Sequence, residues 1–204
     1  FRYDGVMDRT GARSIPYTLS ADMDYTRATL LAQRLNLKSG GSELKLQGKI
    51  SQVLNSGISG KLEYTGTVEV PFLNYFFTKE TFAGKAGVTG ALEFSRGYFM
   101  TRGSAVATAV DFAGWRATNL TGEYTYAYPD RQLSFEKIKT EIAGGDISGR
   151  VVVEHLPGPS RVLVDIAYSG VDAASLARAY PWDPKYRIFS RMTGTLNGWL
   201  EGRL

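Results

Sequence analysis

Residues 60–72 read GKLEYTGTVEVPF and alternate strictly between two kinds of side chain. The even positions are apolar or glycine, and the odd positions are charged, threonine or proline. Successive side chains of a β-strand point to opposite faces, so this stretch predicts a strand with one apolar and one polar face. The same alternation recurs in residues 17–26, 162–168 and 194–204. The sequence therefore predicts an all-β protein built as a half-exposed antiparallel sheet.

Glycine falls repeatedly on the apolar parity of these strands. The positions are Gly48, Gly60, Gly66, Gly90, Gly122, Gly149, Gly194, Gly198 and Gly202. A face that is apolar yet short of side-chain bulk predicts either a sharply bent core or a lined groove.

Composition excludes several classes of protein. The chain has 204 residues, of which 43% are hydrophobic and 23 are glycine, which favours a folded protein of many short strands and turns. The formal net charge is +4 and the basic residues form no run, so we expect no nucleic-acid partner. No cysteine is present, which rules out disulfides and thiolate metal sites.

The order of the predicted elements suggests a weak internal repeat over residues 17–100 and 103–204. Each part has a glycine turn, two strands, an intervening segment and a glycine-spaced strand. A short helix is predicted over Asp172–Tyr180, with Asp172 as N-cap and Pro181 as the stop. Residues 72–77 are the equivalent, poorer candidate for a helix, and Arg27–Leu35 is assigned as strand. We interpret residues 1–204 as one unit of a longer protein.

Catalytic groups are scarce. His155 is the only histidine, the acidic residues are spread along polar parities, and no phosphate loop or dinucleotide motif occurs. We therefore expect no enzyme, no metal site and no cofactor. The alternate tyrosines Tyr124, Tyr126 and Tyr128 share one face, which leaves open a carbohydrate-binding platform or simple packing on the apolar side.

Three motifs carry a family resemblance. They are the turn and strand GGDISGRVVV (144–153), the segment VDAASLARAY (171–180) and the closing GTLNGWLEG (194–202). Together they resemble the repeating unit of the AsmA/TamB superfamily, which includes bridge-like lipid transfer proteins. The resemblance implies an elongated, twisted antiparallel sheet curled into a taco-like groove, apolar inside and polar outside, with one or two short helices.

The resemblance also implies a function and a location. Such proteins belong to the Gram-negative cell envelope, are anchored in the inner membrane and cross the periplasm. They carry phospholipid toward the outer membrane or support outer-membrane biogenesis, with an outer-membrane β-barrel partner contacted through other parts of the chain. We therefore expect a periplasmic, non-enzymatic conduit for phospholipid acyl chains.

The apolar parity supplies the residues expected to line the groove. They are Leu46, Ile50, Leu62, Tyr64, Val68, Val70, Leu92, Phe94, Val151, Val153, Val162, Val164, Ile166, Leu196 and Leu200. The alternatives are a structural or adhesive β-scaffold in which these residues form a closed core, or a carbohydrate-binding module. An open groove predicts that aspartate is tolerated at Leu62 and Val164, whereas a closed core predicts unfolding.

Overall fold

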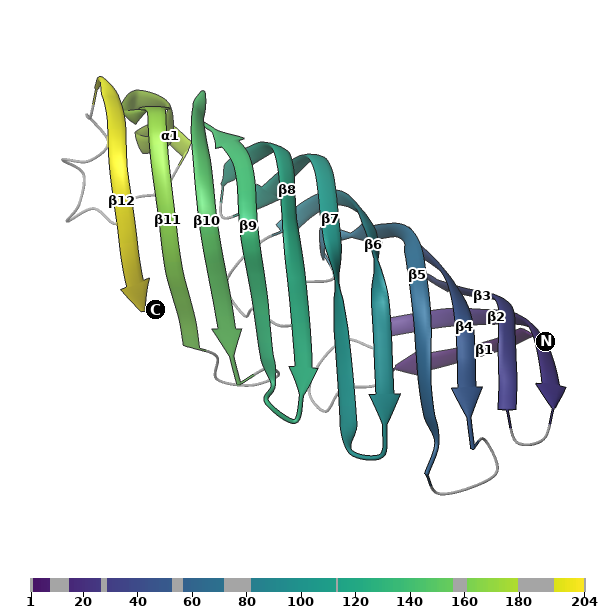
Figure 1. The fold of residues 1–204 in the computed structure, drawn as a ribbon. Helices are drawn as coiled ribbons and strands as arrows, with labels where there is room; N and C mark the ends of the chain where they lie inside the picture. The colour runs from purple at the N-terminus through teal and green to yellow at the C-terminus, as the bar shows by residue number, and fades with distance from the viewer. Residues whose placement is uncertain are drawn as a thin grey trace.

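The computed structural model describes residues 2–7, 15–26, 29–52, 57–71, 82–112, 114–155, 161–179 and 193–203. In these ranges the chain is all-β, and its strands form one open, curled antiparallel sheet, as the sequence predicted (Figure 1). The elements are β1 (Arg2–Met7), β2 (Ile15–Thr26), β3 (Thr29–Ser39), β4 (Ser42–Ser51), β5 (Ser59–Glu69), β6 (Phe82–Ser95), β7 (Tyr98–Phe112), β8 (Trp115–Tyr128), β9 (Gln132–Ile142), β10 (Gly145–Glu154), β11 (Arg161–Asp172), α1 (Ala173–Ala179) and β12 (Thr195–Arg203).

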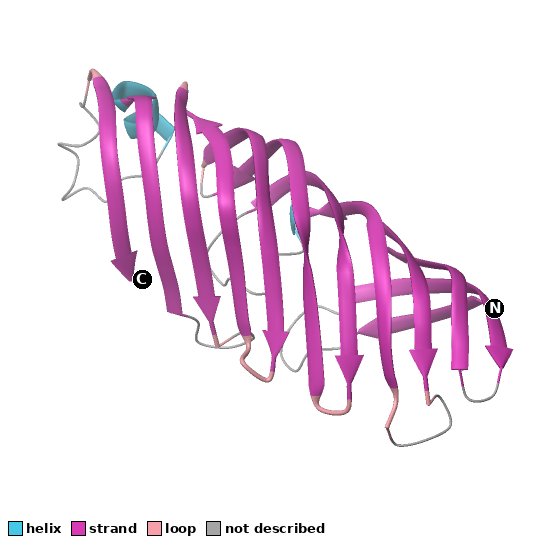
Figure 2. Ribbon diagram, in the orientation of Figure 1, coloured by secondary structure: helices cyan, strands magenta, loops and turns pink. Residues whose placement is uncertain are grey.

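The strand order in the sheet is the order in the chain. Every strand from β2 to β11 pairs with its two sequence neighbours, and all the pairings are antiparallel. The strands lie side by side from the N-terminal to the C-terminal end, and the sheet twists along its length (Figure 2). The sheet edges are formed by β1 and β12.

The register keeps the apolar parities of successive strands on one face. One row of directly opposite residues runs through eleven consecutive strands. From β2 to β12 it contains Ala21, Leu35, Leu46, Tyr64, Gly90, Gly103, Tyr124, Phe135, Val151, Val164 and Gly202. We call this the central row. At roughly 4.8 Å between strands it extends for about 48 Å across the sheet.

β-Bulges keep this register across irregular positions. Gln33 and Arg34 of β3 lie between the pairs Ala32–Gly48 and Leu35–Leu46, so two residues face one on β4. Glu136 and Lys137 of β9 do the same opposite β10. A bulge inserts a residue and increases the local twist without moving the flanking side chains to the wrong face.

Gly48 and Gly149 occupy matching places beside these two bulges. Their φ angles are 147° and 148°, a region that side-chain-bearing residues rarely adopt. A Cβ at either glycine would also collide with the carbonyl oxygen of the next strand, Lys61 or Asp165 respectively. The strands β3–β5 and β9–β11 thus share a local geometry, although the internal repeat over residues 17–100 and 103–204 remains a prediction.

The predicted helix is confirmed as α1. Asp172 Oδ2 accepts a 2.7 Å hydrogen bond from the backbone N–H of Ser175, as an N-cap does. The start of the helix is also fixed by Ala173 N–H, which donates to the carbonyl of Gly194. Arg27–Leu35 was correctly assigned as strand where the structure describes it, from Thr29 onward. The second helix candidate, residues 72–77, lies outside the described residues.

Packing is tightest at the end of the sheet where β7, β9 and β11 finish, which we call the helix end because α1 lies there (Figure 2). Val70, Ala107 and Val110 form a buried cluster, and Phe82, Ala86 and Leu120 pack against it. Ala173 and Ala177 of α1 are buried as well. At the opposite end Phe94, Phe99 and Tyr128 lie side by side in the register, and we call it the aromatic end.

Candidate functional site

The two faces of the sheet differ completely in charge. Every described Asp, Glu, Lys and Arg with a cross-strand partner lies on the parity opposite to the central row. We call that side the polar face and the side of the central row the apolar face. The candidate site is this apolar face, which the described strands of one open sheet keep free of charge.

All the residues predicted to line a groove lie on this apolar face. Leu46, Tyr64, Val151 and Val164 belong to the central row, and the others in strands lie in parallel rows of the same parity. Val70 follows β5 and reaches the face by packing with Ala107 and Val110. The structure therefore brings these side chains onto one continuous surface.

Exposure varies along that surface. Most of the lining residues are half-buried, and Leu200 near the β12 edge is 51% exposed. Leu62, Val70 and Val153 are closed instead, with Leu62 only 5% exposed. Leu62 is therefore a closed position, and its side chain packs over Gly48. Val164 is half-buried.

No large side chain among the described residues is fully enclosed. The described strands all belong to one hydrogen-bonded sheet. A β-sandwich of similar composition would bury bulky side chains between its two sheets.

Aromatic rings account for several glycines on the apolar face. A Cβ at Gly90 would lie 2.5 Å from Tyr64 Oη, and one at Gly198 would lie 2.7 Å from Tyr168 Oη. Phe94 covers Gly60 in the same way, at 2.6 Å. The missing side chains are thus spaces into which rings of the adjacent strand extend. Cross-strand pairs of this kind stabilise a sheet where glycine would weaken it.

The middle of the central row has a symmetric arrangement of tyrosine and glycine. Gly90 of β6 lies opposite Gly103 of β7, with Tyr64 of β5 on one side and Tyr124 of β8 on the other. Both tyrosines extend over the glycines, and their Oη atoms meet at 2.6 Å. Thr101 Oγ1 lies 2.7 Å from Tyr64 Oη. We call Tyr64, Thr101 and Tyr124 the hydroxyl cluster.

Burial raises the pKa of Tyr124, and its hydrogen bond with Tyr64 raises this pKa further. A raised pKa keeps the phenol protonated at neutral pH, so Tyr124 stays a neutral hydroxyl group. The cluster is consequently polar but uncharged, in keeping with the rest of the apolar face.

Two of the alternate tyrosines of β8 have contacts within the sheet. The Tyr124 hydroxyl is hydrogen-bonded to Tyr64, and Tyr126 meets Phe99 edge to face, with ring centroids 6.1 Å apart. Tyr128 is exposed at the end of the strand. Sugar binding needs accessible ring faces, and these contacts favour the packing interpretation of Tyr124 and Tyr126.

The polar face carries cross-strand ion pairs. Lys61 lies 3.0 Å from Glu93, Arg102 lies 3.8 Å from the same carboxylate, and Arg150 lies 3.5 Å from Asp165. The face is not uniformly hydrophilic, because Val106 and Trp199 are exposed there. Exposed ion pairs of this type each contribute little to the free energy of unfolding. They show that the charged side chains of neighbouring strands lie together on the polar face.

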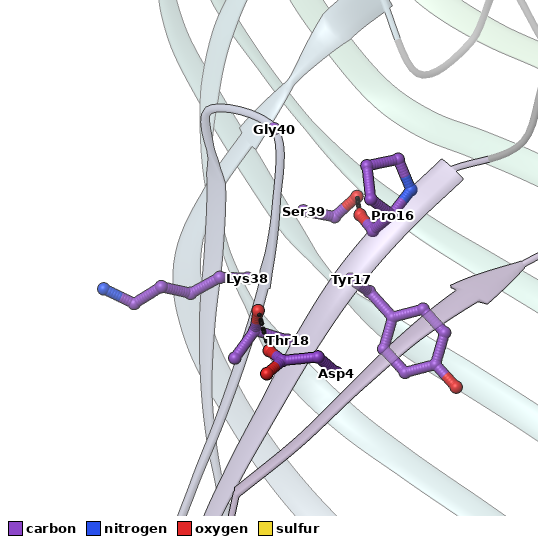
Figure 3. A pocket seen from close by; sticks show the side chains of 7 residues that line it. All are labelled: Asp4, Pro16, Tyr17, Thr18, Lys38, Ser39 and Gly40. Atoms are coloured by element: carbon purple, nitrogen blue, oxygen red, sulfur yellow. Dashed lines mark hydrogen bonds between the residues drawn. The ribbon is translucent and has the colours of Figure 1, made fainter.

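A pocket near the β1 edge lies beside charged groups of the polar face (Figure 3). Thr18 donates a 2.7 Å hydrogen bond to Asp4, and Ser39 donates to the carbonyl of Pro16. The Thr18 hydrogen bond, with Arg2 nearby, lowers the pKa of Asp4. Asp4, Thr18, Ser39 and Pro16 of this pocket are thus paired with one another, and Lys38 pairs with Glu43 outside it.

Chemical groups suited to catalysis are not brought together in the described part of the chain. His155 lies exposed after β10, and its carbonyl accepts a hydrogen bond from Arg131. Within the described ranges, no three His, Asp or Glu side chains are grouped closely enough to hold a metal ion. No helix in these ranges has the length and apolar character needed to cross a bilayer.

Sequence reasoning missed the hydroxyl cluster. Tyr64 and Tyr124 are separated by 60 positions, and Tyr64 was considered only as a lining residue. The available signal was a pair of glycines, Gly90 and Gly103, at matching depth in two strands of one hairpin. Such a pair leaves room for long side chains from both flanking strands.

Comparison with protein-family models, curated proteins and solved structures finds no match to this chain. Support for a function therefore comes from the geometry of the sheet.

Proposed function

We propose that this chain is a non-enzymatic lipid-binding segment that carries phospholipid acyl chains along its apolar face. The observation that carries the proposal is the segregation of charge. A surface about 48 Å long offers apolar and hydroxyl groups only, while all the strand charges lie behind it. An exposed apolar surface of this extent in a monomer marks an interaction site.

The chemistry of acyl chains fits this surface. Transfer of each CH₂ group from water to an apolar environment is favourable by about 0.8 kcal/mol, and this gain needs no specific partner atom. A half-buried surface of aliphatic and aromatic side chains can hold chains of different length in many positions. That property suits transfer better than it suits a single tight binding site.

The wider setting follows from the resemblance to the AsmA/TamB superfamily. We propose a periplasmic location in an inner-membrane-anchored protein that supports outer-membrane biogenesis. An outer-membrane β-barrel partner would be contacted by other parts of such a protein. The rival function is a structural scaffold, in which another layer of protein covers the apolar face.

Site-specific crosslinking tests the proposal. A photoreactive phenylalanine analogue is placed at Val164 on the apolar face or at Ala167 on the polar face of the same strand. After expression in Gram-negative cells and illumination, we expect phospholipid on the Val164 probe and none on the Ala167 probe. Crosslinks from Val164 to protein alone, without co-purified phospholipid by mass spectrometry, would favour the scaffold.

A further inference from the structure

The hydroxyl cluster has more hydrogen-bond donors than its own contacts use. Tyr64, Thr101 and Tyr124 carry three hydroxyl protons, and the two hydrogen bonds that join them use two. Within the described residues, the cluster holds no acceptor for the third proton. One O–H group is thus available to a molecule lying on the apolar face.

This free O–H group lies in a half-buried place on the apolar face. It lies in the middle of the central row, where Gly90 and Gly103 lower the surface between two tyrosines. Three different strands, β5, β7 and β8, supply its members. All three side chains are half-buried, so the cluster is partly shielded from water and still reachable from the open side.

We propose that the hydroxyl cluster binds the ester carbonyl of an acyl chain held on the apolar face. This inference rests on the proposed lipid-binding function and specifies the part of the lipid that is recognised. The O–H group needs an acceptor, and an ester carbonyl is the neutral acceptor at the head of an acyl chain.

The surroundings argue against a charged acceptor. A phosphate group or a free carboxylate would lie on a face where no described strand residue is Lys or Arg, and its desolvation would have no ionic compensation. An ester carbonyl loses far less solvation energy on entering the same place. The lipid headgroup is accordingly expected to stay away from the cluster, toward solvent.

A competition between two lipids tests the assignment. The 204-residue chain is incubated with equal amounts of dimyristoyl phosphatidylcholine and of its diether analogue, which lacks both carbonyl oxygens. Native mass spectrometry then measures the ratio of the two bound lipids in one sample. A neutral hydrogen bond predicts about a three- to tenfold preference for the ester lipid.

The variant Tyr64→Phe/Thr101→Val/Tyr124→Phe removes the three hydroxyls and keeps nearly the same volumes. It should bind the two lipids equally. The matched control, Thr89→Val/Ser104→Ala, removes a hydrogen-bonded hydroxyl pair from the polar face of β6 and β7 and should keep the preference. If the triple variant fails to fold, a second measurement uses the unmodified chain with ester lipid labelled with carbon-13 at the carbonyl: its bound C=O stretch should lie below the value in an apolar solvent, and a stretch at the apolar-solvent value overturns the assignment.

The outcomes separate the two proposals. Equal binding of both lipids by the unmodified chain, or an unchanged preference in a folded hydroxyl-free variant, overturns the carbonyl assignment and leaves lipid binding standing. Binding of neither lipid overturns the proposed function itself. Preferential binding of the ester lipid that is lost only with the cluster supports both.

Discussion

The helix end and the aromatic end of the sheet share one apolar face but close it to different degrees. At the helix end Val110 is 6% exposed, and Ala117 and Ile142 are buried too. At the aromatic end Phe99 is 37% and Tyr128 is 47% exposed, although they lie directly opposite each other in the register. Alternation alone therefore does not decide whether an apolar strand position is enclosed.

Side-chain size explains the difference. Ala107, Ala117, Ala173 and Ala177 are all buried at the helix end, where their small volumes allow close approach of strands and helix. Phe99 and Tyr128 at the aromatic end stay partly exposed, whereas Leu62 and Val153, in the next row toward the middle of the sheet, are closed. Small residues thus close the helix end, and the outermost aromatic row leaves apolar surface accessible.

The sharpest test of this contrast is a charge at the closed end. Val110→Asp would place a carboxylate among Val70, Ala107 and Leu120, where desolvation costs several kcal/mol against a typical domain stability of about 5–15 kcal/mol. We expect unfolding or a large fall in the midpoint of urea unfolding, followed by circular dichroism. Val106→Asp is the matched control: the same change in the same strand, at an exposed position on the polar face. Equal effects at both sites would contradict the assignment of the closed end.

A methyl group in the middle of the central row should have the next largest effect. Gly90→Ala places a Cβ 2.4 Å from the carbonyl oxygen of Arg102 and 2.5 Å from Tyr64 Oη, so both the neighbouring strand and the ring must move, at a cost of about 1–3 kcal/mol. Gly87→Ala in the same strand meets its nearest atom, the Val106 carbonyl oxygen, only at 3.7 Å and should be close to neutral. Thermal unfolding of both variants measures the difference. Similar melting temperatures would show that neither the strand nor the ring closes the space over Gly90.

The same substitution should destabilise the fold less at an open position of the apolar face. Val164→Asp lies on a half-buried part of the apolar face that water can reach, so we expect a loss of about 1–2 kcal/mol, within the range for partial exposure of a valine. Lipid crosslinking from a probe at neighbouring Ile166 should fall sharply. Ala167→Asp on the polar face of β11 should change neither quantity. Global unfolding by Val164→Asp would mean that this region is sealed like the helix end.

The smallest effect is expected from acid at the helix cap. Hydrogen bonds from Ser175 lower the pKa of Asp172, so its carboxylate stabilises α1 above the unfolded pKa of about 3.9. That contribution is lost as the pH falls through the lowered folded pKa. Asp172→Asn keeps a capping oxygen but has no carboxyl group to titrate. The amide-exchange protection factors of α1 should therefore fall at acid pH in the unmodified chain and stay constant in this variant. An Asp172 carboxyl that titrates at its ordinary value, measured by NMR, would contradict this.

Much of the fold could be predicted from the sequence because it depends on local patterns. Period-two alternation predicts the strands, and the Asp172 cap with Pro181 predicts the helix. Nearest-neighbour pairing follows where short turns such as Gly40-Gly41 leave no room for another topology.

The degree of closure could not be predicted in the same way. Leu62 and Val164 occupy the same parity in equivalent patterns, yet Leu62 is buried and Val164 is half-buried. Leu62 packs over Gly48 of the neighbouring strand, and such contacts between strands are not revealed by a polarity pattern. The hydroxyl cluster depends on the alignment of four strands, and that alignment exists only in the folded sheet.

The agreement between strand order and chain order bears on how the protein is made. Each hairpin can complete its hydrogen bonds as soon as its second strand has left the ribosome or a translocation pore, because no strand waits for a distant partner. The growing sheet then always has one newly exposed edge, and the next segment of the same chain arrives first to cover it. Sequential arrival of this kind shields a long apolar sheet from the edge-to-edge aggregation to which isolated strands are prone.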